Sequence, residues 1–205
     1  MKISEGIKLK GEFVEIPDCS RDDLPNFFKE MKYKVGAEIG VYKGEFTKKL
    51  CKTGMKIYGI DPWIVYKNYR KHPKELPYDE LYNNTKKLLE PYNCIVIKKT
   101  SMDALEDFED ESLDFVYIDG NHSLPYITQD IYDWYRKVKK GGIVSGHDYC
   151  LTGKNPYGLR VCHVKTAVDI CAKIFSVKTL YVLGEKRQKE GEKRDKWRSW
   201  FFIKE

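Results

Sequence analysis

Short apolar segments alternate with helical segments along almost the whole chain, and this alternation constrains the fold more than any other feature. The expected strands are residues 35–41, 55–60, 94–97, 113–118, 143–145, 177–183 and 200–203. The first expected helix begins at a capping box at Ser20. The other expected helices span residues 44–52, 78–90, 102–108, 124–137 and 164–174. Because parallel neighbours need crossover connections, the pattern predicts an α/β fold with helices on both faces of one sheet. Only the last two strands, joined by a charged segment, are expected to pair as an antiparallel hairpin.

A glycine-punctuated turn follows the first expected strand. Gly40 and Gly44 flank a corner where the missing Cβ permits positive φ and lets a ligand approach the main chain. The first N–H groups of the next helix face such a ligand. The Gly-x-x-x-Gly spacing of this turn differs from the Gly-x-Gly-x-x-Gly spacing of turns that bind pyrophosphates. The acid Glu38, near the end of the strand, suits a nucleotide-like cofactor that carries an amine. Glycine pairs between strand and helix also occur without any cofactor, so the turn alone leaves both interpretations open.

Polar residues stand at the carboxyl ends of the expected strands, where open α/β sheets bind ligands. They are Glu38, Asp61, Ser101, Asp119 with His122, and His147 with Asp148. One acid after a strand is usually a turn former, but acids at four of five strand ends predict a binding site. Asp61 suits a diol, because one carboxylate accepts two hydrogen bonds from adjacent ribose hydroxyls. Trp63 is either an apolar wall for a base or a core residue.

The composition favours one domain with one core, since the chain has 205 residues. With 37 basic and 31 acidic residues the net charge is +6, but no compact arginine-rich block indicates nucleic-acid binding. The six cysteines contain no Cys-x-x-Cys pair, so they are expected to be reduced and mostly packed. The first residues lack the apolar core of a signal peptide, and no long apolar run occurs. We therefore expect a cytoplasmic protein.

Four ordered motifs resemble one enzyme family. They are Ala-Glu-Ile-Gly-Val-Tyr-Lys-Gly-Glu-Phe from residue 37, Gly-Ile-Asp-Pro-Trp from 59, Asp-Phe-Val-Tyr-Ile-Asp-Gly-Asn-His from 114 and Gly-Gly-Ile-Val-Ser-Gly-His-Asp-Tyr from 141. The set resembles the class I S-adenosylmethionine-dependent methyltransferases, and more narrowly their small-molecule and sugar O-methyltransferase branch. The resemblance covers residues 21–204. It implies an enzyme of class EC 2.1.1. The methyltransferase domain would span residues 21–205 and follow an irregular segment, residues 1–20. Its sheet would be Rossmann-like, with seven strands in the order 3-2-1-4-5-7-6 and strand 7 antiparallel.

The resemblance also implies cofactor contacts. Glu38, Gly40 and Gly44 match the motif that holds the methionine portion of S-adenosylmethionine. Asp61 matches the acid that binds the ribose hydroxyls. The remaining implied cofactor neighbours are Trp63 and Ser101 at the adenine and Asp119 at the transferred methyl.

The chemistry implied is an in-line displacement in which a base removes the acceptor's proton. In the related branch, Mg²⁺ held by acids matching Asp119 and Asp148 binds the acceptor, and a histidine matching His122 is the base. His147 stands where another acid would be expected, so metal dependence stays open. His147 is a catalytic candidate that orients Asp148 or the acceptor, and His122 is alternatively a helix cap.

The acceptor is expected to be a small molecule or a saccharide. Residues 64–77, rich in Tyr and Lys, are expected to form either a lid or a solvated loop. No membrane or nucleic-acid partner is expected, and a homo-oligomer is left open. Two other classes compete: a nicotinamide-dependent oxidoreductase, and a non-catalytic nucleotide- or nucleic-acid-binding protein. The Gly-x-x-x-Gly turn argues against the oxidoreductase, and strand-end acids would repel the phosphates of a nucleic acid.

Overall fold

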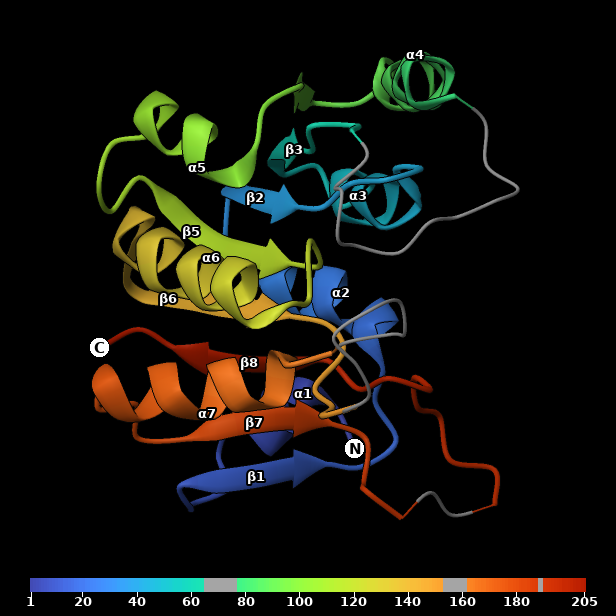
Figure 1. The fold of residues 1–205 in the computed structure, drawn as a ribbon. Coiled ribbons are helices and arrows are strands. Elements are labelled where there is room, and N and C mark those ends of the chain that lie inside the picture. Colours follow the sequence, from blue (N-terminus) through green and yellow to red (C-terminus); the bar gives the residue numbers. More distant parts are fainter. Residues whose placement is uncertain (65–76, 153–161, 188–189) are drawn as a thin grey trace.

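The computed structural model describes residues 1–64, 77–152, 162–187 and 190–205. Its centre is an eight-stranded sheet in the order β1-β7-β8-β6-β5-β2-β3-β4 (Figure 1). The strands are β1 (Phe13–Ile16), β2 (Val35–Ile39), β3 (Lys56–Ile60), β4 (Cys94–Ile97), β5 (Leu113–Ile118), β6 (Val138–Gly146), β7 (Leu180–Leu183) and β8 (Trp200–Ile203). The helices are α1 (Ile3–Gly6), α2 (Leu24–Glu30), α3 (Glu45–Cys51), α4 (Tyr78–Leu89), α5 (Ser101–Ala104), α6 (Leu124–Lys137) and α7 (Val164–Ile174), with 3₁₀ turns η1 (Arg21–Asp23) and η2 (Leu105–Asp107).

The predicted α/β architecture is present, but the sheet has one strand more than expected. Residues 1–20 are not irregular: they form α1 and β1, and β1 pairs in parallel with β7. The count of seven strands is therefore wrong, and the full order gains an edge strand. From β4 to β7 the strands follow the expected order, and β8 is antiparallel to both β6 and β7. Only Val14 and Ile16 of β1 are buried, too short an alternation to stand out in the sequence.

A second difference lies at the start of β6. Gly141 and Gly142 resemble a glycine signal at the end of a helix, but they lie within β6, which begins at Val138, before the strand expected at residues 143–145. The helix α6 ends at Lys137 as predicted. Gly141 has a φ of 76°, and the pairing of β5 with β6 is irregular at this end of the strands. The glycine pair thus shapes a distorted strand instead of capping a helix.

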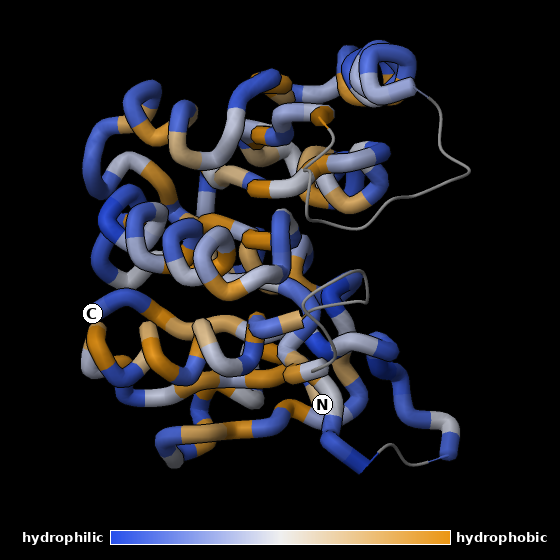
Figure 2. Tube along the Cα trace, in the orientation of Figure 1, coloured by the Kyte–Doolittle hydropathy of each residue, from blue (hydrophilic) through white to orange (hydrophobic). Residues whose placement is uncertain are grey.

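Side chains alternate along β5 between two apolar clusters, one on each face of the sheet. Val116 and Ile118 pack in the cluster that includes residues of α6 and α7. Phe115 and Tyr117 pack in the cluster that includes residues of α1, α2 and α3. Helices α6 and α7 lie side by side on the first face (Figure 1). Figure 2 shows hydrophobic residues along the strands and a largely hydrophilic α4 at the periphery.

Parallel pairing brings the carboxyl ends of four strands to one edge of the sheet. Ile39 at the end of β2 is paired with Ile60 of β3 and with Ile118 of β5. Ile118 is in turn paired with Gly146 at the end of β6. The loops after these strands therefore meet at one place. Among the described residues, no helix is both long and apolar enough to cross a membrane.

Candidate functional site

A cavity of about 600 Å³ opens at this carboxyl edge, a size typical of small-molecule sites. It collects nearly all of the side chains expected from the strand ends. Those lining it are Glu38, Gly40, Asp61, Trp63, Ser101, Asp119, His122, His147 and Asp148. The residues that the sequence spreads over more than a hundred positions thus share one cavity, as parallel pairing predicts.

Gly40 is required at the cavity by both backbone angle and space. Its φ is 92°, and a Cβ there would lie 2.3 Å from the backbone oxygen of Asp119. Its N–H donates to the carbonyl oxygen of Ile60, 2.8 Å away, which fixes the turn against β3. Gly44 does not line the cavity: with a φ of 77°, it turns the chain into α3, and its Cβ would lie 3.0 Å from Thr85.

Glu38 is a buried acid at the cavity floor, with only 2 % of its surface exposed. Burial raises its pKa from 4.5 to about 8, because the charged form loses its hydration. Within the described part of the chain, Glu38 Oε2 has no hydrogen-bond partner. A buried carboxylate oxygen without a partner is costly, so a ligand that brings an ammonium group would satisfy it.

Asp61 is held by the backbone of its own loop and of the glycine turn. Its Oδ2 accepts from the Tyr42 N–H at 2.9 Å, and its Oδ1 accepts from the Trp63 N–H at 2.7 Å. Burial raises the pKa of Asp61, and these backbone hydrogen bonds oppose the rise. Each carboxylate oxygen keeps a second lone pair, so two adjacent hydroxyls can still donate to it.

Trp63, for which the sequence left two roles open, is packed in the core and also lines the cavity. It is 2 % exposed and packs with Val41 and Leu81 in a small cluster under the cavity. Its Nε1 donates to the carbonyl oxygen of Tyr42 at 2.9 Å, which fixes the indole ring. Trp63 is therefore a core residue that also forms one wall of the cavity.

Ser101 lies at the start of α5 and donates a short hydrogen bond to Asp130. Asp130 comes from the middle of α6, is buried, and also lines the cavity. Burial raises the pKa of Asp130 to about 7. Nothing in the sequence distinguishes Asp130 from the other acids on an amphipathic helix.

His122 lies between the acids at the ends of β5 and β6. Its Nδ1 is 2.9 Å from Asp148 Oδ2, and its Nε2 is 3.2 Å from Asp119 Oδ1. The resemblance implied that the two carboxylates could hold a cation, but the imidazole ring lies between them. An imidazolium would be attracted to both carboxylates, whereas a neutral ring with its proton on Nδ1 keeps a lone pair on Nε2.

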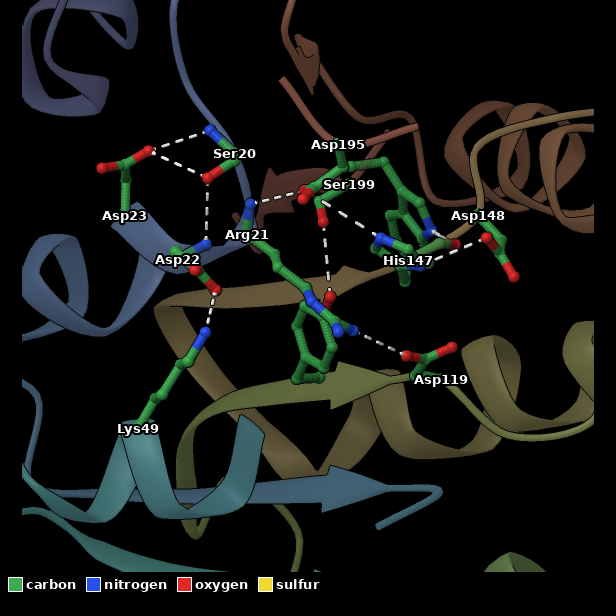
Figure 3. A network of polar contacts seen from close by, with 12 residues as sticks. Ser20, Arg21, Asp22, Asp23, Lys49, Asp119, His147, Asp148, Asp195 and Ser199 are labelled. Carbon is green, nitrogen blue, oxygen red and sulfur yellow. Dashed lines mark hydrogen bonds and ion pairs between the residues drawn. The ribbon is translucent and has the colours of Figure 1, made fainter. Parts of the chain in front are cut away.

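His147 supports Asp148 from the other side. Its Nδ1 lies 3.2 Å from Asp148 Oδ1, and its Nε2 is 3.9 Å from Asp195 Oδ2 (Figure 3). Burial would raise the pKa of Asp148, but the hydrogen bonds from His122 and His147 hold it well below its usual range. Burial would likewise lower the pKa of His147, but its hydrogen bond to Asp148 and the charge of Asp119 raise it. Asp148 is therefore a carboxylate fixed by two imidazoles.

Arg21 is a cavity residue that the sequence did not single out. Its Nη1 donates to Asp119 Oδ2 at 3.3 Å, and its backbone N–H donates to Asp195 at 2.7 Å (Figure 3). Its guanidinium carbon lies 5.5 Å from the centre of the Phe46 ring, within reach of a cation–π contact. In the sequence, Arg21 was only part of the helix start at Ser20, because nothing local indicates that η1 packs over the carboxyl edge.

The arrangement does not fit Mg²⁺. One atom each of Asp119, His147 and Asp148 lies within 4.8 Å of the others. All four oxygens of Asp119 and Asp148, however, already contact His122, His147 or Arg21. Mg²⁺ requires near-octahedral oxygen coordination, and the nearby guanidinium repels a divalent cation. The metal ligands Asp119 and Asp148 remain an expectation without support from this geometry.

Three non-glycine residues of the cavity have positive φ: Tyr42 at 53°, Trp63 at 46° and Asp148 at 56°. Such conformations are uncommon outside glycine and tend to cluster at functional sites. Residues 65–76, which include most of the expected lid, lie outside the described residues. Trp197, in the segment before β8, also lines the cavity and was not anticipated.

Solved structures with a similar fold include several methyltransferases. An O-methyltransferase from Bacillus cereus, in complex with SAH, aligns with a TM-score of 0.61 and 14% identity over 98% of this chain and 87% of that one. A SAM-dependent O-methyltransferase from Thermotoga maritima aligns with a TM-score of 0.57 and 13% identity over 88% and 64%. A tRNA (m1A58) methyltransferase from Aquifex aeolicus aligns with a TM-score of 0.57 and 12% identity, over 87% of this chain and 67% of that one. At these identities the likeness concerns the fold alone.

Sequence comparison gives two further matches. An uncharacterized protein, y4gI, of Sinorhizobium fredii is 34% identical over 53 residues, which span 26% of this chain and 6% of that protein. A family model described as a methyltransferase domain matches residues 37–149, more than half of the chain. The matched range contains the glycine turn and the strand-end residues up to Asp148. The chain belongs to this methyltransferase domain family.

Proposed function

We propose that this chain transfers the methyl group of S-adenosylmethionine to a hydroxyl oxygen of a small molecule or a saccharide. The observation that carries the proposal is the placement of His122 between Asp148 and Asp119 on the cavity wall. A base held by one carboxylate and facing a ligand cavity is the arrangement that proton removal from a hydroxyl needs. The O-methyltransferases among the structures of similar fold support the same reading.

The chain's residues fit the cofactor at two positions. Glu38, with its unpartnered Oε2, would bind the ammonium group of the methionine portion. Asp61 would accept hydrogen bonds from the two ribose hydroxyls, with Trp63 beside the base. Ser101 and Asp130, joined by a short hydrogen bond, would face the adenine. Gly40 provides the close backbone approach between these groups.

When bound, S-adenosylmethionine would supply a methyl group on a positively charged sulfur, which would leave as a neutral thioether. His122 Nε2 takes the hydroxyl proton, while Asp148 holds Nδ1 and stabilises the resulting imidazolium. His147 acts through Asp148, so it is a positioning residue. Arg21 fixes Asp119 beside the acceptor.

The proposed reaction uses no divalent cation, because the oxygens of Asp119 and Asp148 are already engaged. Arg21 supplies positive charge next to Asp119. A nearby cation favours the deprotonated form of an acceptor hydroxyl.

We place the reaction in the cytoplasm and assign residues 21–205 to the catalytic domain. Helix α1 and strand β1 would then be an addition at the edge of that domain.

Calorimetric titration tests the proposal. Reduced protein is titrated with S-adenosylmethionine and, separately, with NADH, in EDTA; catechol and a methyl glycoside are then added as acceptors with radiolabelled cofactor. We expect saturable one-to-one binding of S-adenosylmethionine, no NADH binding, and label in one acceptor class. Binding of NADH alone would favour an oxidoreductase. A primary amine is added as a third acceptor, and label transferred to the amine but to neither hydroxyl acceptor would overturn O-methylation.

A further inference from the structure

Two cysteines that are 12 positions apart in the sequence meet beside Asp148, the residue that contacts the proposed base His122. Cys150 Sγ lies 3.2 Å from Cys162 Sγ, and both are thiols. Cys150 follows β6 by four residues, and Cys162 precedes α7. The two segments are held together by backbone contacts, since Thr152 and Cys162 form an antiparallel bridge with an N–H to O distance of 3.0 Å. The fold itself, and not a flexible side chain, keeps the sulfurs adjacent.

The same two cysteines contact the residues that position the proposed base. The Cys150 N–H donates to the Asp148 carbonyl oxygen at 2.5 Å, and Cys162 Sγ lies 3.4 Å from that oxygen. The neighbour of Cys162 also takes part, because the His163 N–H donates to the His122 carbonyl oxygen at 2.9 Å. These short contacts connect the two cysteine segments to Asp148 and His122.

The local environment favours oxidation of this pair. Cys150 is partly exposed, which gives a small oxidant access, while Cys162 is buried. The hydrogen bond from Cys150 lowers the pKa of the Cys162 thiol, although burial opposes the effect. A second thiol next to a reactive one captures a sulfenic acid before it is oxidised further.

We propose that Cys150 and Cys162 form a reversible disulfide that acts on the proposed methyl-transfer site through Asp148. The oxidant is hydrogen peroxide: one thiolate attacks a peroxide oxygen, the O–O bond breaks, and the departing hydroxide takes up the proton that the thiol had lost, so that a sulfenic acid and water form. The other thiol then attacks the sulfenic sulfur, the S–O bond breaks, and a second water leaves. The two electrons lost by the sulfurs reduce the peroxide, so the step balances.

The disulfide requires the sulfurs to move from 3.2 Å to about 2.05 Å apart. A displacement of about 1 Å at a catalytic group can reduce turnover up to about a hundredfold. Oxidation is expected to displace the Asp148 backbone and to lower turnover by about tenfold or more. The expected loss of turnover rests on the proposed function, whereas the formation of the disulfide does not.

The first experiment maps the disulfide. Full-length protein is treated with a small excess of hydrogen peroxide, alkylated and digested, and its peptides are compared by mass spectrometry with those of a dithiothreitol-treated sample. We expect a peptide linking Cys150 to Cys162 and two fewer free thiols, and neither in Cys150→Ser or Cys162→Ser. Cys51 and Cys171, two buried thiols, are the internal control and should stay unlinked. A folded, oxidised protein without the Cys150–Cys162 peptide overturns the proposal.

The second experiment measures turnover of the same samples with the best acceptor found. Oxidised wild-type protein should lose activity and recover it with dithiothreitol, and Cys150→Ser should be unaffected by peroxide. Unchanged turnover in a protein with a mapped disulfide would overturn the link to Asp148. Failure of the reduced protein to bind S-adenosylmethionine would instead overturn the proposed function, and the mapping result would stand independently.

Discussion

His122 Nδ1 lies 2.9 Å from Asp148 Oδ2, and this contact joins the loop after β5 to the end of β6. Asp148 has a φ of 56° and is fixed from its other side by His147. A carboxylate held in this way sets the ring orientation of His122 and leaves Nε2 toward the cavity and Asp119. The pairing explains how two residues from adjacent strands can work as one proton acceptor.

His122→Gln should reduce turnover by a factor of about 10² to 10⁴, as expected for loss of a general base. The affinity for S-adenosylmethionine should stay near the wild-type value, because His122 faces the acceptor side of the cavity. Single-turnover kinetics and calorimetry on the same preparation separate the two effects.

His163→Gln is the matched control, since His163 accepts a hydrogen bond from the Leu124 N–H and does not line the cavity. Its turnover should resemble that of the wild type. Equal turnover in His122→Gln and the wild type would remove His122 as the base.

Cofactor affinity should rise with pH up to about 8, because Glu38 must lose a proton to pair with an ammonium group. Binding below that pH releases a proton, which calorimetry in buffers of different ionisation enthalpy detects. Glu38→Gln should bind more weakly and lose this proton release. Proton uptake by the wild-type protein would contradict the assignment.

The same raised pKa makes the unliganded protein less stable at higher pH. Between pH 4.5 and about 8 the folded protein keeps the Glu38 proton that the unfolded chain has lost. Stability therefore falls through this range by up to about 1.4 kcal/mol per pH unit, and the fall ends above the folded pKa. Urea unfolding of Glu38→Gln should show a shallower pH dependence, with Asp130 accounting for a remaining part.

Asp61→Ala should weaken the binding of S-adenosylmethionine by about 1 to 3 kcal/mol, as expected when hydrogen bonds to a charged acceptor are lost. Asp61→Asn keeps one acceptor oxygen and should lose less. The control is Asp107→Ala, since Asp107 pairs with Lys99 outside the cavity. Wild-type affinity in Asp61→Ala, measured by calorimetry, would show that the ribose site lies elsewhere.

Removal of divalent cations should leave both cofactor affinity and turnover unchanged, because Arg21, His122 and His147 already satisfy the acids. Mn²⁺ is a suitable probe, since its free-ion electron paramagnetic resonance signal disappears on binding. The signal should persist when the protein is added together with S-adenosylhomocysteine. Stoichiometric loss of the signal, or turnover restored only by Mg²⁺ after EDTA, would show a metal site after all.

Gly40→Ala should destabilise the protein more than Gly54→Ala, although the two glycines have similar φ values of 92° and 87°. Both variants place a Cβ at positive φ, which costs about 1 to 2 kcal/mol. Only at Gly40 does that Cβ meet backbone, so about 1 to 3 kcal/mol more is expected there. Equal midpoints of urea unfolding would show that the turn relaxes.

The alternation of elements and the glycine turn could be predicted from the sequence, because hydrophobic period and backbone φ are local properties. Helix α6 spans the residues expected, and Asp61, Asp119 and Asp148 share one cavity because parallel strands end at the same edge. The strand β1 was missed because four residues with two buried side chains carry too weak a pattern.

Only the tertiary structure decided which groups face one another. Arg21 reaches Asp119 across 98 positions, and Cys150 meets Cys162 through a backbone bridge. His122 also lies between two acids that the resemblance had assigned to a metal. The sequence determined which residues stand at the carboxyl edge, since strand direction fixes that. Their pairing depends on side-chain packing and loop paths, which involve distances that no local pattern encodes.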